Sequence, residues 1–325
     1  MKKKTDKCFE KEQSQLIIIY GRRRIGKSAL IAAILPENSI FFMADQSDAS
    51  IQRFQLARMI AEEINGFDKI VYPDWDALFQ NLANSLQRKI TISLDEFPYL
   101  VKNSPELPSI IQRVCDKGVN KNFHLILCGS SQQMMRSLIL NYNSPLYGRA
   151  TEILRLKGMN VFWLKEALAC TDEQAIIEYS IWGGIARYWQ IRSEEKDLNS
   201  AILNNVLDKS GILHEEPIRL FIDEMRESVL AFSILNMIGN GANRLSEIAG
   251  RLNKPASSLS GTMQVLIELG FIRREIPFGT SLKSTKKTLY KISDQFMLFY
   301  FRLVNPNLSR LELDMKEQVL NNNKE

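Results

Sequence analysis

The feature that most constrains this chain is a short loop that begins with glycine and ends in Gly-Lys-Ser. It reads Gly21-Arg22-Arg23-Arg24-Ile25-Gly26-Lys27-Ser28 and fits the phosphate-binding pattern G-x-x-x-x-G-K-[ST]. The β-branched run 16–20 before it predicts a buried parallel strand, and the run 29–35 after it predicts a helix that stops at Pro36. A chance match is the alternative, and the flanking strand and helix argue against it.

The chemistry expected at this loop follows from its backbone and its side chains. Loop N–H groups and the start of the next helix present positive partial charge, so residues 21–29, ending at Ala29, are expected to hold nucleotide phosphates. Lys27 is expected to reach the β- and γ-phosphates, and the Ser28 hydroxyl to bind Mg²⁺. The run Arg22-Arg23-Arg24 leaves two interpretations open: a solvated basic loop, or extra contacts to phosphate or a neighbouring subunit.

A second stretch carries two adjacent carboxylates at the end of a predicted strand. The run 90–94 is rich in β-branched residues and is followed by Asp95 and Glu96. Because ligands bind at the carboxyl ends of parallel strands, Asp95 is expected to hold the Mg²⁺ shell. Glu96 points the other way and is expected to orient or deprotonate the attacking water. A solvated Asp-Glu turn is the alternative, which the upstream phosphate loop makes the weaker one.

Predicted strands alternate with predicted helices through the first half of the chain. Further strands are expected over 40–44, 123–129 and 151–156, and Asp74 is expected to be the N-cap of a helix that begins at Trp75. This alternation predicts an α/β fold with a doubly wound parallel sheet. Ser130 follows the fourth strand, where it would either touch the γ-phosphate or cap the next helix.

The pattern becomes helical after the first domain, expected over 1–158. Residues 159–228 predict a helical lid, broken by Gly183-Gly184. Residues 229–304 predict three helices and a two-stranded ribbon, which together make a winged helix-turn-helix. Residues 305–325 predict a C-terminal tail with one amphipathic helix.

The ribbon of the winged helix carries most of the basic side chains of that domain. These include Arg273, Arg274, Lys283, Lys286 and Lys287. Lysine-rich wings suit contacts to DNA phosphates, so duplex DNA binding with little base specificity is one prediction. The alternative is a protein-contact module whose lysines are merely solvated.

Composition excludes several classes of protein. No apolar run approaches the about 18 residues of a membrane span, and no apolar stretch follows Lys2-Lys3-Lys4 as in a secretory signal. The four cysteines lack C-x-x-C spacing, which predicts reduced thiols and a cytoplasmic protein; Cys128 is expected to serve packing. With two histidines in the chain, a histidine-based metal site is not expected.

Together these runs resemble the archaeal-type ATPases of prokaryotes, AAA+/STAND-like P-loop proteins with a C-terminal winged helix. The resemblance covers residues 9–307. The runs that carry it are the loop 21–28, Leu94-Asp95-Glu96-Phe97-Pro98-Tyr99-Leu100, Gly129-Ser130-Ser131, Pro145-Leu146-Tyr147-Gly148-Arg149 and Gly183-Gly184. It implies a P-loop sheet of order 5-1-4-3-2, ATP with Mg²⁺, a γ-phosphate sensor at Ser130 and an arginine finger at Arg149.

Two points stay open under this resemblance: the role of Arg149 and the length of the chain after the winged helix. Arg149 would act on a neighbouring subunit's nucleotide at the edge of its site, which implies a homo-oligomer; the alternative is an ion pair with a local carboxylate. Members often continue into a nuclease-like domain, whereas 18 residues follow Asn307, so a short or truncated member is expected.

The leading functional hypothesis is Mg²⁺-dependent ATP hydrolysis coupled to the winged helix. The second hypothesis is a slow-turnover nucleotide switch that mainly binds DNA or a protein partner. A kinase acting on a small substrate is a third, which the Asp95-Glu96 pair and the appended winged helix disfavour.

Overall fold

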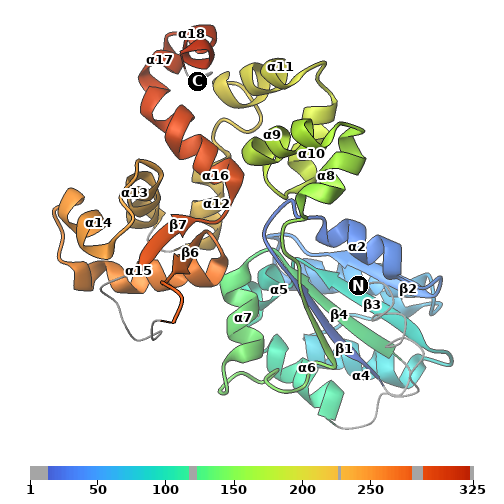
Figure 1. Ribbon diagram of the computed structural model, residues 1–325. Helices are drawn as coiled ribbons and strands as arrows, with labels where there is room; N and C mark the ends of the chain where they lie inside the picture. The colour runs from blue at the N-terminus through green and yellow to red at the C-terminus, as the bar shows by residue number, and fades with distance from the viewer. Residues whose placement is uncertain (1–13, 117–122, 226–227, 280–287, 323–325) are drawn as a thin grey trace. The chain divides into compact units, whose positions relative to one another are not determined.

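The computed structural model describes residues 14–116, 123–225, 228–279 and 288–322 (Figure 1). The chain divides into two units, Met1–Lys157 and Gly158–Glu325, and each is described by itself. The division falls where the sequence pattern changes from alternating strands and helices to helices alone.

The first unit is built on a five-stranded parallel sheet of order β2-β3-β4-β1-β5. This is the expected order 5-1-4-3-2 seen from the other edge, and the P-loop α/β fold is confirmed. Central strands β1, β3 and β4 are buried on both faces, which is why they read as continuous apolar runs. The strands are β1 Leu16–Tyr20, β2 Ser39–Met43, β3 Ile90–Asp95, β4 Phe123–Gly129 and β5 Glu152–Arg155.

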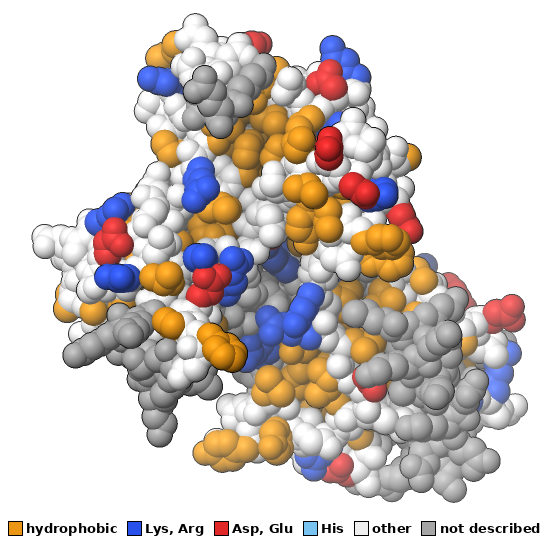
Figure 2. All heavy atoms as spheres, in the orientation of Figure 1, with side chains coloured by type: hydrophobic (Ala, Val, Ile, Leu, Met, Phe, Trp, Pro, Cys, Tyr) orange, Lys and Arg blue, Asp and Glu red, His pale blue; other side chains and the backbone are white. Residues whose placement is uncertain are grey.

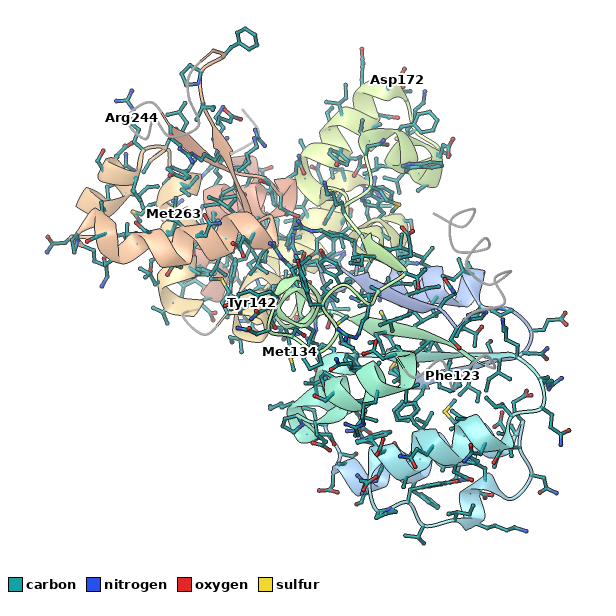
Figure 3. All side chains as sticks on the ribbon, turned by 90° about the horizontal axis from the view of Figure 1, so that it is seen from below. Phe123, Met134, Tyr142, Asp172, Arg244 and Met263 are labelled. Atoms are coloured by element: carbon teal, nitrogen blue, oxygen red, sulfur yellow. The ribbon has the colours of Figure 1, made fainter. Side chains whose placement is uncertain are left out.

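Helices cover both faces of this sheet, with α2 on one side and α4 and α6 on the other (Figure 1). The expected N-cap of α4 is confirmed, since the Asp74 carboxylate accepts a hydrogen bond from the Ala77 amide. Phe123, labelled in Figure 3, stacks on Phe79 of α4 with ring centroids 6.4 Å apart. The helices are α2 Lys27–Ile34, α3 Ala49–Ala61, η1 Phe67–Lys69, α4 Trp75–Ser85, α5 Phe97–Asn103, α6 Leu107–Asp116 and α7 Gln132–Leu140.

The second unit begins with a group of short helices. Helix α9 starts with a capping box in which Thr171 and Gln174 bond to each other's backbone amides. A buried ion pair joins Glu178 to Arg192, and Glu178 also accepts from the Trp182 indole at 2.7 Å. The helices are α8 Val161–Leu168, α9 Asp172–Trp182, α10 Ala186–Ser193, α11 Leu198–Ile202, η2 Leu203–Leu207 and α12 Glu216–Glu224.

The expected helices and ribbon of the winged helix follow in the same unit. Met263 of α15, labelled in Figure 3, is buried, and β6 and β7 pair antiparallel. The elements are α13 Ser228–Gly239, α14 Leu245–Arg251, α15 Ala256–Leu269, β6 Ile272–Glu275, β7 Leu289–Ile292, α16 Gln295–Phe299 and η3 Tyr300–Val304.

The tail forms more than the one helix expected for it. After η4 Asn305–Asn307 come α17 Leu308–Glu312 and α18 Lys316–Asn321, separated by a left-handed turn at Asp314 (φ 58°). Lys316 bonds to Asp208 at 2.5 Å just after η2, so the tail is attached to the helical region of its own unit. Among the described residues, none of the helices has the length and apolar character needed to cross a membrane.

Candidate nucleotide-binding site

The phosphate-binding loop lies between β1 and α2, at the carboxyl edge of the sheet, as expected. Gly26 is the N-cap of α2 with φ 96°, a left-handed conformation that glycine adopts without steric cost. Gly21 is required for another reason: a Cβ there would lie 2.8 Å from the Leu156 carbonyl oxygen. Both expected glycine roles, backbone freedom and close approach, are therefore met.

Lys27 is held inside the loop. Its side chain is buried, at 6% exposure, and its ammonium donates to the carbonyl oxygens of Gly21 and Arg22 at 3.1 and 3.2 Å. These bonds fold the side chain back along the loop that would surround a phosphate. The cation is thus held at the loop, where charge neutralisation of phosphate oxygens is strongest.

The two expected magnesium ligands meet. The Ser28 hydroxyl, at the start of α2, donates to Asp95 Oδ2 at 2.7 Å, and Asp95 ends β3 with 1% exposure. A hydroxyl and a carboxylate are hard oxygen donors, which fit Mg²⁺. Among the described residues no group of three His, Cys, Asp or Glu side chains could hold a metal. Mg²⁺ bound by one or two protein oxygens keeps waters and takes substrate phosphates as its other ligands.

Glu96 has an unexpected partner. Its backbone is left-handed (φ 50°), and its Oε2 accepts hydrogen bonds from both the hydroxyl and the amide of Ser130, at 2.7 and 3.2 Å. The N-cap residue of α7 is the neighbouring Ser131, and contact of Ser130 with a γ-phosphate stays a prediction. In this structure Ser130 donates hydrogen bonds to Glu96. No local sequence pattern predicts this pair, because the two residues follow different strands.

The three loop arginines are not equivalent. Arg22 is 7% exposed, and Arg23 donates from Nη2 to the Tyr99 hydroxyl at 3.1 Å. A solvated basic loop therefore does not describe these two side chains. Arg24 has φ 63°, a conformation that non-glycine residues seldom adopt.

Cys128 lies fully buried on the apolar strand β4, as expected for a packing residue, in register beside Ile19 of β1. What the sequence did not show is its neighbour on the other side: the register of β3 and β4 puts Cys128 next to Asp95. Burial, followed by the charge of Asp95, raises the pKa of the Cys128 thiol. The signal that could have shown this is the position of each residue in its strand. Cys128 lies near the end of β4 and Asp95 at the end of β3, and parallel neighbouring strands end at the same edge of the sheet.

Arg149 lies elsewhere, which corrects one expectation. It precedes β5, whereas the phosphate loop follows β1, and β1 and β5 are parallel. Arg149 is therefore at the amino edge of the sheet, about 15 Å from its own chain's loop at about 3.3 Å per residue. Its guanidinium makes a two-pronged ion pair with Asp116, with Nε to Oδ1 at 2.9 Å and Nη2 to Oδ2 at 2.8 Å. Within one chain Arg149 therefore does not border the loop, and it makes the ion pair with a local carboxylate that was the alternative; its action on a neighbouring copy stays a prediction.

The described part of the wing, strands β6 and β7, has a smaller net positive charge than its basic residues alone suggest, because it also carries an acidic side chain. Glu275 accepts from both Arg273, at 2.8 Å, and Lys291, at 2.7 Å, and these two cations lower the pKa of its carboxyl, Lys291 first. Figure 2 shows this mixture of basic and acidic side chains over α14, β6 and β7. Arg274 donates to Thr288 Oγ1 at 3.3 Å. Lys283, Lys286 and Lys287 lie outside the described residues.

Comparison with known families decides the assignment. Residues 3–187, more than half of the chain, match the family described as "ATPase domain predominantly from Archaea". The chain belongs to this archaeal-type ATPase family. The match includes the phosphate loop, Asp95, Glu96, Ser130 and Arg149. Residues 231–275 match the IclR helix-turn-helix domain, which confirms the helix-turn-helix expected after the lid.

Individual relatives and solved structures show how far the likeness extends along the chain. "Uncharacterized protein MJECL04" of Methanocaldococcus jannaschii is 35% identical over 302 residues, which is 92% of this chain and 66% of that protein. The chain thus spans just under two thirds of that relative. The Walker-type ATPase PABY2304 of Pyrococcus abyssi has a similar fold, with a TM-score of 0.69 and 21% identity over 92% of this chain and 95% of that chain. The Aeropyrum pernix ORC1 protein, solved with DNA, gives a TM-score of 0.42 and 15% identity over 91% and 88% of the two chains.

Proposed function

We propose that this protein binds ATP with Mg²⁺ at residues 21–29 and hydrolyses it, and that the nucleotide state controls its winged helix. The observation that carries the proposal is the 2.7 Å hydrogen bond from Ser28 to Asp95. It joins the loop to the end of β3 and makes one oxygen site from two motifs far apart in sequence. Membership of the archaeal-type ATPase family supports the choice of ATP.

Each side chain has a distinct part in this proposal. Lys27 and the loop amides neutralise the β- and γ-phosphates, and Ser28 and Asp95 hold Mg²⁺. When bound, Mg²⁺ supplies positive charge to the phosphate oxygens. Glu96 takes the proton of the attacking water, or orients that water, from the position that Ser130 gives its carboxylate.

A second candidate function is favoured by one observation, the pair of hydrogen bonds from Ser130 to Glu96. Both bonds go to Oε2, so acceptor sites on this oxygen that an attacking water would need are already occupied. The alternative is therefore a nucleotide switch that turns over slowly and acts mainly by binding. In this assignment 159–228 is the lid, 229–304 the winged helix and 305–325 the tail.

Steady-state phosphate release by the full chain, with Mg²⁺ and with or without duplex DNA, separates the two candidates. Multiple turnovers that stop when EDTA removes Mg²⁺ support the ATPase. Tight nucleotide binding with turnover below about 10⁻² s⁻¹, the range of unassisted nucleotide switches, supports the switch. Failure to bind ATP at all contradicts both.

Arg149 is expected to act in trans, on the nucleotide of a neighbouring copy. Asp116 holds its guanidinium at the amino edge of the sheet, away from its own loop, and arginine fingers contribute about 10³-fold or more to rate in the best cases. We expect Arg149→Ala and Lys27→Ala each to be inactive alone. Mixed, they should regain activity, because the intact arginine of one copy serves the intact loop of the other.

The control for this mixture is the assembly state of each variant, measured by light scattering. If both variants fold and assemble but the mixture stays inactive, Arg149 serves only its ion pair with Asp116.

The wing is expected to bind duplex DNA through phosphates. Changing Lys283, Lys286 and Lys287 together to alanine should flatten the slope of log K against log salt by up to about three units, because each phosphate contact contributes about 0.9. All DNA sequences should weaken alike, since phosphate contacts carry no base information. The measurement is fluorescence anisotropy with labelled duplexes at several salt concentrations.

A substitution at Glu275 is expected to have the opposite effect on DNA binding. Glu275→Gln removes the carboxylate shared by Arg273 and Lys291, so DNA binding should strengthen and the salt slope should steepen. Glu268→Gln, on α15, has the same charge change away from the ribbon and is the matched control. Unchanged affinity and slope in the triple lysine variant leave the protein-contact interpretation of the wing.

A further inference from the structure

Cys128 is the buried reactive group that the proposed mechanism does not use. It is completely buried on β4 and borders the carboxylate on which the proposed metal site depends. At neutral pH an unperturbed thiol is almost entirely protonated, so it is available as a hydrogen-bond donor.

Strand register places Cys128 beside Asp95. Leu94 of β3 is paired with Leu127 of β4, so the next residues of the two strands, Asp95 and Cys128, are also neighbours. Adjacent strands lie about 4.8 Å apart, and residues side by side in register point to the same face. On its other side Cys128 is in register with Ile19 of β1, the strand that leads into the phosphate loop.

The Asp95 carboxylate is then surrounded by donors from three directions. Ser28 donates to Oδ2 at 2.7 Å from α2, and the Glu96 amide donates to Oδ1 at 2.9 Å from the following residue. The Cys128 thiol approaches from the neighbouring strand. A buried carboxylate needs such partners to replace its lost contacts with water and to fix its orientation.

We infer that Cys128 is a positioning residue for magnesium: its thiol orients the Asp95 carboxylate so that Oδ2 faces Ser28 and the metal. The inference deepens the proposed function and rests on it. It goes beyond the expectation from sequence that Cys128 serves packing.

The test compares three substitutions. Cys128→Val keeps the volume but removes the donor, Cys128→Ala removes both, and Cys128→Ser keeps a donor. Cys115→Val is the matched control, because Cys115 belongs to the same unit but lies at the end of α6, beside Asp116 and Arg149. The full-length chain is titrated with the fluorescent nucleotide MANT-ADP in Mg²⁺ and again in EDTA, and the thermal midpoint is recorded for each variant.

The measured quantity is the gain in MANT-ADP affinity that Mg²⁺ provides. We expect this gain to fall about fivefold in Cys128→Val and Cys128→Ala, as for the loss of one hydrogen bond of ordinary strength, because a thiol is a weak donor. Cys128→Ser should restore it to within about twofold, and Cys115→Val should leave it unchanged. Affinity in EDTA should be similar in all, because the loop itself is intact.

Two results overturn the inference while leaving the proposed function standing. One is an unchanged magnesium gain in both Cys128→Val and Cys128→Ala. The other is a loss of gain that follows the thermal midpoint across all three variants, Cys128→Ser included, which is the behaviour of a purely structural residue. If the unmodified protein fails to bind MANT-ADP with or without Mg²⁺, the proposed function fails and the inference falls with it. If Cys128→Val does not fold, the comparison of Cys128→Ala with Cys128→Ser decides.

Discussion

Lys27→Ala is expected to abolish ATP binding, with an increase in Kd of about 100-fold or more. The buried ammonium donates hydrogen bonds to the carbonyl oxygens of Gly21 and Arg22, so its charge is held at the loop itself. Charge-assisted bonds to phosphate are about twice as strong as neutral ones, and the loop amides alone do not replace the lost charge. MANT-nucleotide titration measures the effect.

The control for Lys27→Ala is an exposed lysine of the same unit. Lys69→Ala, at the end of η1, removes the same charge away from the loop and should bind ATP as the unmodified protein does. A Lys27→Ala protein that is folded by circular dichroism and still binds ATP at normal strength would show that residues 21–29 do not hold the nucleotide.

Glu96→Gln is expected to keep ATP binding and to lose turnover by about 10²- to 10⁴-fold, the range for a general base. Glutamine has the same shape and retains a carbonyl oxygen that accepts the hydrogen bonds from Ser130. The substitution therefore removes basicity while leaving the position intact. Steady-state phosphate release and MANT-ATP affinity, measured on one preparation, separate the two properties.

Glu106→Gln is the matched control for this variant. Glu106 is exposed and precedes α6, so the same change of charge there should leave both binding and turnover unaltered. Hydrolysis at the normal rate by Glu96→Gln assigns the water to another residue and removes Glu96 from the mechanism.

Much of the fold of the first unit could be predicted from local sequence patterns. The phosphate loop, the carboxylate-ended strand at 90–95 and the cap at Asp74 all lie where they were predicted, because their patterns depend on neighbours within a few residues. Helix α5 was not predicted, because it lacks such a local pattern. It is short and has Pro98 in its first turn, so it has no helical periodicity to detect.

The sheet order came from the family resemblance, and the structure confirmed it. Strand alternation alone predicts a parallel sheet, but many orders satisfy it. The tail was predicted as one helix because Leu311 and Val319 recur at a helical spacing. The structure interrupts it at Asp314, where a left-handed residue turns the chain and lets Lys316 reach Asp208.

The sequence by itself determined the groups that lie within one continuous segment. These are the loop with Lys27 and Ser28, and the Asp95-Glu96 pair. Only the tertiary structure decided which groups meet across strands. It pairs Ser28 with Asp95, Ser130 with Glu96, and Cys128 with Asp95, and it places Arg149 at the far edge of the sheet. The physical reason is that register between parallel strands depends on how whole elements pack, and no short-range pattern encodes which residues will be side by side.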